Sequence, residues 1–138
     1  MKPPPIFSGR CISIHSITEQ FNGFFAEFDK REHRDFRVAA AILDTSLRKG
    51  RSPGGRSERV EGSRAGLFEL RITPPGRRGP HTRALYVCEG PALLIVRGVH
   101  KAQRGIRKRE IELADRAALA WQEHGDERGR DRAPRGSP

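Results

Sequence analysis

Cationic side chains gather at the ends of three short apolar runs in the middle of the chain. The runs read GLFELRI, HTRALYV and ALLIVRGVHK, and they begin at residues 66, 81 and 92. The residues in them that carry chemistry are Glu69, Arg71, Arg83, Tyr86, Arg97, His100 and Lys101. Brought together on one region of a small sheet, side chains of these types are able to cleave RNA without a metal ion.

Such cleavage needs a base for the ribose 2′-hydroxyl proton, cations for the charge at phosphorus, and an acid for the departing 5′ oxygen. Arginine suits the second task because its planar guanidinium holds two phosphate oxygens and stays protonated. Histidine transfers protons near neutral pH, and tyrosine stacks on a base or holds the 2′-hydroxyl. Composition and spacing alone nevertheless favour a simpler interpretation, in which these are exposed, solubilising positions of a basic protein.

The charge balance favours an anionic partner. The chain of 138 residues has a formal net charge of +10 and 35% hydrophobic residues, which predicts a single domain with one modest core. The tail from Gly125 onward holds four arginines against three acidic residues, so a charge of +9 remains for the rest of the chain. A field of this sign favours nucleic acid, another polyanion or an acidic protein.

Motifs for cofactors, metals and membranes are missing from the sequence. It contains no nucleotide-binding glycine loop, no Gly-x-Ser-x-Gly elbow and no metal-ligand spacing. Its two cysteines are too few for a disulfide framework, which favours a reducing compartment. The first residues lack a signal-peptide core, and the longest apolar run, residues 92–96, is far shorter than the roughly 20 residues of a membrane span. We therefore predict a cytoplasmic protein with no cofactor, no metal and no membrane partner.

Three segments divide the chain. Residues 1–15 form a proline-rich arm, with a short strand over residues 11–15. Residues 16–124 hold the periodic patterns of a folded domain. Residues 125–138 are a basic tail with almost no apolar content, which predicts disorder.

Helical periodicity dominates the first half of the folded domain. Ser16 and Glu19 have the spacing of a capping box, and phenylalanines then recur on one helical face. This stripe either packs against a sheet, which we prefer, or forms a docking surface for a partner. A charged break at residues 29–34 leads to a second periodic run that ends at Gly50. Two antiparallel helices and one kinked helix are both allowed.

Strand patterns dominate the second half. Residues 50–65, rich in glycine, serine and arginine, are either a flexible linker or an arm that tracks phosphates. Alternation then predicts a strand over residues 67–73, with Arg71 on its open face. The register of the next strand is ambiguous, and residues 92–99 are apolar enough for a central strand. A final helix is predicted over residues 110–121.

Four segments, taken in order, resemble the RelE/HigB superfamily of toxins from type II toxin-antitoxin systems. They are residues 66–71, 83–86, 99–101 and 110–114. The resemblance is nearest to the phage-derived toxin-like branch and covers about residues 21–121. It implies a RelE-like α+β fold for the domain: an N-terminal helical pair on a small antiparallel sheet of three to four strands, followed by a C-terminal helix. Messenger RNA would lie on the sheet face that the helices leave open.

The resemblance also implies an activity and partners. The activity is metal-free, ribosome-dependent endoribonuclease cleavage of messenger RNA through 2′-hydroxyl attack. The partners are messenger RNA on the ribosome and a cognate antitoxin, often one with a helix-turn-helix domain. Two alternatives remain open, namely a ParE-like toxin that acts on DNA gyrase without cutting RNA, and a basic RNA-binding module without activity.

Residue roles follow from the same resemblance. Arg71 and Arg83 match cations that contact the phosphate. Tyr86 matches an aromatic residue in the same strand, and Lys101 matches a cation linked to the leaving group. The expected catalytic set is Arg71, Arg83, Tyr86, His100 and Lys101. The expected RNA-binding set is Arg64, Arg97, Arg104, Arg107 and Lys108.

Residues 100–106 depart from the branch pattern. His100 stands where a pair of lysines usually begins, and residues 102–106 lack the usual Thr-x-Lys-Thr-Pro-like segment. Either His100 replaces a lysine as a proton-transfer group or the site is weakened. Some relatives also use a tyrosine near the final helix, whereas the single tyrosine here is Tyr86. The general base is therefore open.

Overall fold

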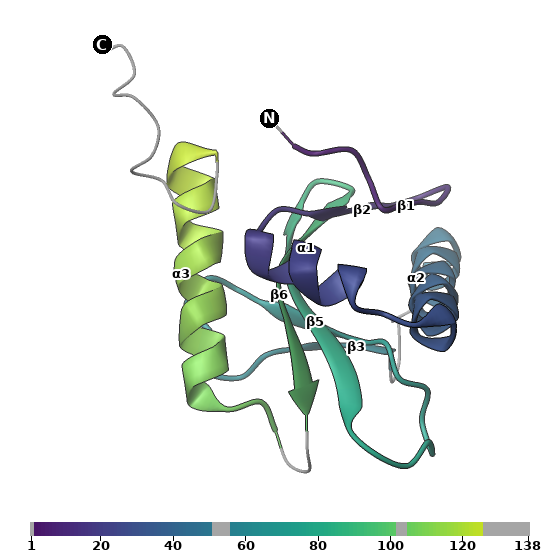
Figure 1. Ribbon diagram of the computed structural model, residues 1–138. Coiled ribbons are helices and arrows are strands. Elements are labelled where there is room, and N and C mark those ends of the chain that lie inside the picture. Colours follow the sequence, from purple (N-terminus) through teal and green to yellow (C-terminus); the bar gives the residue numbers. More distant parts are fainter. Residues whose placement is uncertain (1, 51–55, 102–104, 126–138) are drawn as a thin grey trace.

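The computed structural model describes residues 2–50, 56–101 and 105–125. Within them, three helices and one sheet of six strands form an α+β domain (Figure 1). The strands are β1 (Phe7–Ser8), β2 (Ser13–Ser16), β3 (Ser57–Arg59), β4 (Phe68–Arg71), β5 (His81–Glu89) and β6 (Ala92–Lys101). The helices are α1 (Glu19–Ala26), α2 (Lys30–Arg48) and α3 (Lys108–His124).

The observed sheet differs from the predicted one in its number of strands, in its strand order and in the direction of its strands. Its order is β1-β2-β6-β5-β4-β3, and β2 runs parallel to β6 whereas the other neighbours are antiparallel. The expected RelE-like sheet of three to four antiparallel strands is therefore wrong. β1 and β3 have two and three residues, which is too short for alternation to show. The pairing of β2 with β6 joins segments far apart in the sequence, which no local pattern reveals.

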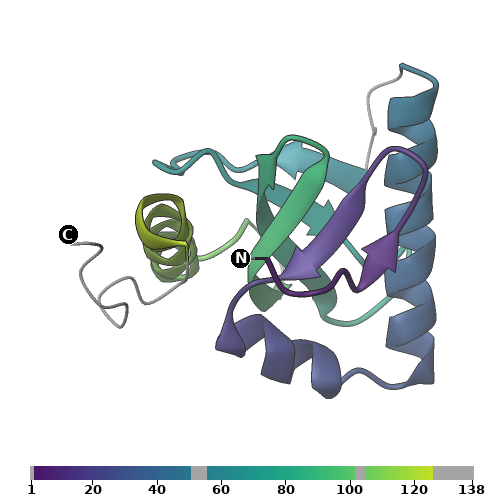
Figure 2. The same cartoon turned by 90° about the horizontal axis from the view of Figure 1, so that it is seen from above.

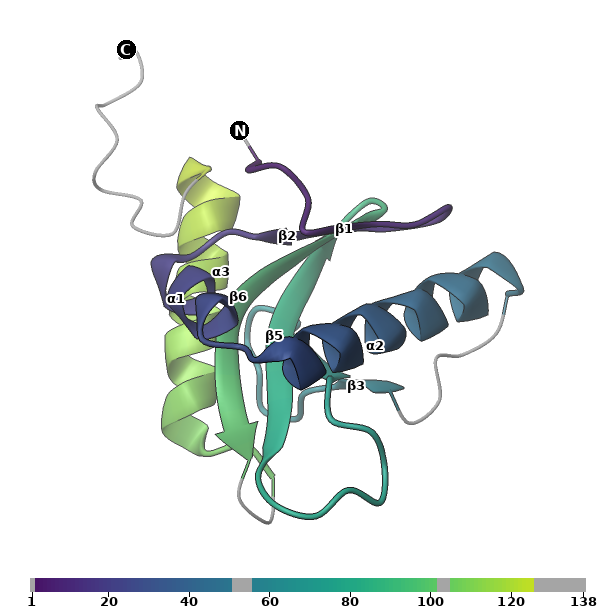
Figure 3. The same cartoon turned by 45° about the vertical axis from the view of Figure 1, so that its right-hand side comes forward.

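The first two helices pack on one face of the sheet, as expected for an N-terminal helical pair, but they form neither an antiparallel pair nor one kinked helix. α1 and α2 follow each other in an L shape over the same face of the sheet, called here the α1/α2 face (Figures 2 and 3). α3 packs on the opposite face, called here the α3 face (Figure 1). The sheet face that was expected to stay open for RNA is therefore covered in part by α3.

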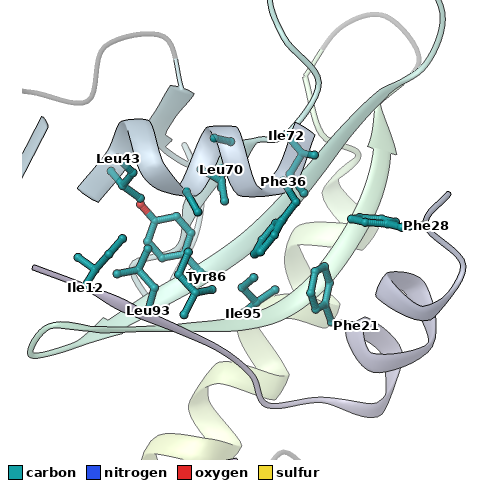
Figure 4. Close-up of a cluster of buried hydrophobic side chains, with 14 residues drawn as sticks. Ile12, Phe21, Phe28, Phe36, Leu43, Leu70, Ile72, Tyr86, Leu93 and Ile95 are labelled. Atoms are coloured by element: carbon teal, nitrogen blue, oxygen red, sulfur yellow. The ribbon is translucent and has the colours of Figure 1, made fainter. Parts of the chain in front are cut away.

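Each face has its own hydrophobic core. Phe21 of α1, Phe28 in the connection to α2 and Phe36 of α2 pack on the α1/α2 face, which confirms the packing interpretation of the phenylalanine stripe (Figure 4). The α3 face buries Trp121 and the small residues of α3 against the sheet. The residues of this core below α3 are Leu67, just before β4, and Leu85, Val87, Ala92, Leu94 and Val96 of β5 and β6. The two cores follow from strand alternation, because successive side chains point to opposite faces.

Side-chain caps set where α1 and α2 begin. Thr18, not Ser16, caps α1, since its Oγ1 accepts the Phe21 N–H at 3.1 Å. Ser16 instead belongs to β2, so the predicted start was two residues early. Asp29 and Glu32 form a capping box at the start of α2. The charged segment predicted as a break is therefore the first turn of that helix.

Asp44 ties the N-terminal arm to α2. Its carboxylate accepts backbone N–H bonds from Arg10, Cys11 and Ile12 at 3.0, 2.7 and 2.9 Å. Burial raises the pKa of Asp44, but these three bonds and the charge of Arg48 outweigh it, so the pKa lies below its usual value. The ionised carboxylate thus holds the loop between β1 and β2 against the helix.

Candidate functional site

Strand register brings three predicted cations together at one end of the α3 face. Arg71 of β4 lies opposite Arg83 of β5, and Arg83 lies opposite Val99 of β6. Lys101, two residues beyond Val99, points to the same face and lies opposite His81. The cluster of Arg71, Arg83 and Lys101, called here the cation cluster, therefore combines three adjacent strands.

Glu69 is the centre of the cation cluster. Its Oε1 lies 2.7 Å from Arg83 Nε, 3.7 Å from Arg71 Nε and 3.9 Å from Lys101 Nζ. The Glu69 side chain is 9% exposed and that of Arg83 is 7% exposed, so this ion pair is buried. Arg71 also pairs with Glu58 of β3. One carboxylate thus holds three cations within reach of a single phosphate group.

Arg83 is bonded through all three of its side-chain nitrogens. Besides the Nε bond to Glu69, Nη1 donates to the carbonyl of Thr82 at 3.2 Å, and Nη2 lies 3.4 Å from Nδ1 of His81. Burial lowers the pKa of Arg83, whereas Glu69 opposes that shift by its charge and hydrogen bond. An arginine cannot accept a hydrogen bond, so Nδ1 of His81 must be the acceptor and carries no proton in this arrangement.

A pocket of about 290 Å³ opens over the cation cluster. It is lined by Arg71, Thr73, Pro75, His81, Arg83 and Lys101. The side chains of Arg71 and Lys101 are 27% and 19% exposed, so they offer the more accessible charge. Arg83 forms the floor beneath them. A pocket with cationic walls of this size suits a phosphate group with its attached ribose.

Tyr86 and His100 lie on the other face of the sheet. The Tyr86 ring stacks on Phe68 with ring centroids 5.7 Å apart, and its hydroxyl is 2.6 Å from Ser57 Oγ. His100 packs against Phe24 at 4.9 Å. These two members of the predicted catalytic set are therefore separated by the sheet from the cation cluster, and the structure assembles the other three.

The single tyrosine permits a direct test of its burial. Burial raises the pKa of Tyr86 to about 12, while the hydrogen bond with Ser57 lowers it in part. In the folded chain we expect the phenolate absorbance to appear with a midpoint about 12, against the ordinary value of 10.0. The raised pKa stabilises the fold below the unfolded value near pH 10, and that contribution disappears as the pH rises through 12. A midpoint of 10 before unfolding would contradict this placement.

The predicted RNA-binding residues fall in two places, apart from Arg104, which lies outside the described residues. Arg97 pairs with Glu110 at the start of α3, and Arg107 and Lys108 are exposed beside it. Arg64 lies in the loop before β4, where its backbone N–H donates to Asp115 at 2.9 Å. The structure thus groups Arg97, Arg107 and Lys108 near the end of β6 and leaves Arg64 apart.

His81 is a member of the site that the sequence analysis missed, and Glu69 was noted without a role. Both have the strand parity of their cationic neighbours, since Glu69 is two residues from Arg71 and His81 is two residues from Arg83. This shared parity could have been used to predict from the sequence that Glu69 and His81 lie on the same face as Arg71 and Arg83. The position of His81 against Lys101 could not be predicted in this way, because it depends on the register of β5 with β6.

No protein-family model matches the chain, and no curated protein matches it either. Within residues 2–50, 56–101 and 105–125, no group of three or more His, Cys, Asp or Glu side chains is placed to hold a metal ion. In the same part of the chain, no helix has the length and the apolar character needed to cross a bilayer.

Proposed function

We propose that this protein is a toxin of a type II toxin-antitoxin system and that it cleaves messenger RNA on the ribosome without a metal ion. The observation that carries the proposal is the cation cluster around Glu69, with a pocket of about 290 Å³ above it. The resemblance of four ordered sequence segments to RelE/HigB toxins supports the toxin role, as does the charge of +10. The same resemblance suggests an antitoxin with a helix-turn-helix domain as the partner.

The chemistry is a transesterification in which the 2′ oxygen attacks the adjacent phosphorus and the bond from phosphorus to the 5′ oxygen breaks. Arg71, Arg83 and Lys101 stabilise the additional negative charge on the phosphate oxygens in the transition state. The products are a 2′,3′-cyclic phosphate and a 5′-hydroxyl end. Because the cations are already held by Glu69, little reorganisation is needed when the substrate binds.

In this scheme His81 acts as the general base and Lys101 as the general acid. A bound phosphate takes over Arg83 Nη2, which releases Nδ1 of His81 to accept the 2′-hydroxyl proton. The Lys101 ammonium donates a proton to the departing 5′ oxygen. Exchange with water then returns both side chains to their starting states.

Expression in a bacterial host tests the proposal. We expect the wild type to arrest growth and to produce cleaved messenger RNA, and the Arg71→Ala, Lys101→Ala double variant to permit growth. Its cleavage rate on programmed ribosomes should fall at least about a hundredfold, because each cation at a transition-state oxyanion contributes on that order. The matched control is Arg31→Ala with Arg116→Ala, which removes two exposed arginines outside the cluster.

The outcomes separate the alternatives. Growth arrest by the control but not by the cluster variant supports the proposal. Equal growth and intact messenger RNA for the wild type and the cluster variant would overturn it. Growth arrest with intact RNA and inhibited supercoiling by gyrase would favour the ParE-like alternative. RNA binding that weakens with salt, without cleavage products, would favour a basic binding module.

A further inference from the structure

A second pocket, of about 550 Å³, lies beside the cation cluster at the edge of β6. The described residues lining it come from α1, the last residues of β6 and the start of α3. They include Phe24, Arg97, His100, Lys101, Arg107 and Glu110. Lys101 lines both pockets, so the two pockets meet at the end of β6 on either side of this residue. A nucleotide chain bound at the cluster would therefore place a neighbouring unit at this edge.

The backbone of β6 provides hydrogen-bonding groups at this edge. β2 pairs with β6 over Ala92 to Ile95, and beyond that point the side chain of Gln20 takes over. Gln20 Nε2 donates to the Gly98 carbonyl at 2.9 Å, and the Gly98 N–H donates to Gln20 Oε1 at 2.8 Å. Since alternate residues of a strand present their backbone groups to the same edge, the N–H and C=O of His100 point into the edge pocket.

Aromatic surface lies next to these backbone groups. The rings of Phe24 and His100 are in contact, with centroids 4.9 Å apart, and both line the edge pocket. His100 is exposed, and Phe24 is half-buried against the sheet. An aromatic platform beside one donor and one acceptor is the arrangement by which proteins hold a single unstacked base.

Charge and geometry favour RNA over a protein strand as the occupant. Arg97, Lys101 and Arg107 line the edge pocket, and the acidic residue among the lining, Glu110, is paired with Arg97. The side chain of Gln20 already bonds the strand edge at Gly98. The N–H and C=O of His100 are the next pair of backbone groups on that edge. An added protein strand needs several consecutive backbone pairs, whereas one base needs a single pair and a stacking surface.

We propose that the edge pocket is a nucleobase subsite, in which an unstacked base of single-stranded RNA stacks on His100 and Phe24 and bonds to the His100 backbone. This inference rests on the proposed function, because it places the base next to a phosphate at Lys101. His100 then selects and positions the substrate through its ring surface. His100, the first residue at which the sequence departs from the RelE/HigB pattern, would thus help to define which nucleotide is accepted.

Charge-matched oligomers test the subsite. We would compare the affinity of an uncleavable 2′-O-methyl RNA hexamer with that of a hexamer of the same phosphate count that lacks all bases. The wild type should prefer the base-bearing oligomer about tenfold or more, because stacking of one base contributes on that order. His100→Ala should lose most of this preference, while His100→Phe should keep it. His33→Ala is the matched control, since His33 also packs on a phenylalanine of α1, with its ring centroid 4.8 Å from that of Phe25.

The outcomes distinguish a failure of the nucleobase subsite from a failure of the proposed nuclease function. Base preference in the wild type and in His33→Ala, lost in His100→Ala, supports the subsite. Equal affinity of the wild type for both oligomers overturns the subsite and favours an added protein strand as the occupant of the β6 edge. This outcome does not bear on whether the protein cleaves messenger RNA. Base preference combined with intact messenger RNA in cells would keep the subsite and overturn the nuclease. No binding of either oligomer at low salt would overturn both.

Discussion

Arg83→Ala is expected to lower the free energy of unfolding by about 3 kcal/mol, the lower end of the range for breaking a buried ion pair. The substitution leaves the Glu69 carboxylate, 9% exposed, without its nearest cation at 2.7 Å. Arg71 and Lys101 remain at 3.7 and 3.9 Å, which limits the loss. Chemical denaturation monitored by circular dichroism provides the measurement. A change below about 0.5 kcal/mol would show that the pair is not desolvated as the structure indicates.

A second variant separates folding from chemistry at the same position. Glu69→Leu combined with Arg83→Met replaces the ion pair by apolar side chains, which is often neutral for stability. We expect this double variant to recover most of the stability lost in Arg83→Ala. It should still not cleave RNA, because the cation cluster has lost Arg83 and the Glu69 carboxylate that holds Arg71 and Lys101 in place. Recovery of cleavage with the fold would contradict a catalytic role for the cation cluster.

Asp115→Ala is expected to lower the free energy of unfolding by about 3 kcal/mol, because three partly buried donors lose their charged, buried acceptor. Asp115 lies in the middle of α3 and is 2% exposed. Its carboxylate accepts the Ser63 hydroxyl at 2.6 Å and the N–H groups of Arg64 and Ala65 at 2.9 and 3.1 Å. The bonds fasten the loop before β4 to the helix, so the loss should loosen α3 from its face of the sheet.

Glu112→Ala is the matched control for Asp115, since Glu112 is exposed on the same helix. It should change the free energy of unfolding by less than about 0.5 kcal/mol. Hydrogen exchange would locate the effect of Asp115→Ala in α3 and the adjoining loop. A uniform loss of protection over the α1/α2 face instead would contradict a local fastening role.

Alternation and helical periodicity predicted much of the local structure. The alternation predicted over residues 67–73 is confirmed, because Leu70 and Ile72 join the α1/α2 core whereas Leu67 points to the opposite face. That opposite face was predicted to be open but carries the α3 core. The predicted second helix and final helix correspond to α2 and α3. The short strands β1 and β3 were not predicted, because they have too few residues to show a period. The expected RelE-like sheet failed for that reason, and because the β2 and β6 pairing is entirely long-range.

The candidate site was predictable in composition but not in arrangement. Strand parity alone separates Arg83 from Tyr86, three residues later, and His100 from its neighbour Lys101. These pairs cannot share a face of one regular strand, a constraint that the predicted catalytic set did not use. Which parity meets Arg71 depends on the register of β4 with β5, and the sequence of β5 is apolar on both faces.

The sequence by itself therefore determined the chemistry at hand: a basic chain, cations at the ends of three strands, and helices with apolar stripes. Only the tertiary structure decided that Glu69 holds Arg71, Arg83 and Lys101 together, that α3 covers the second face, and that the side chain of Gln20 bonds the edge of β6 at Gly98. The physical reason is that side-chain type and period are local properties, whereas register, strand order and the face on which a helix packs depend on contacts between distant segments.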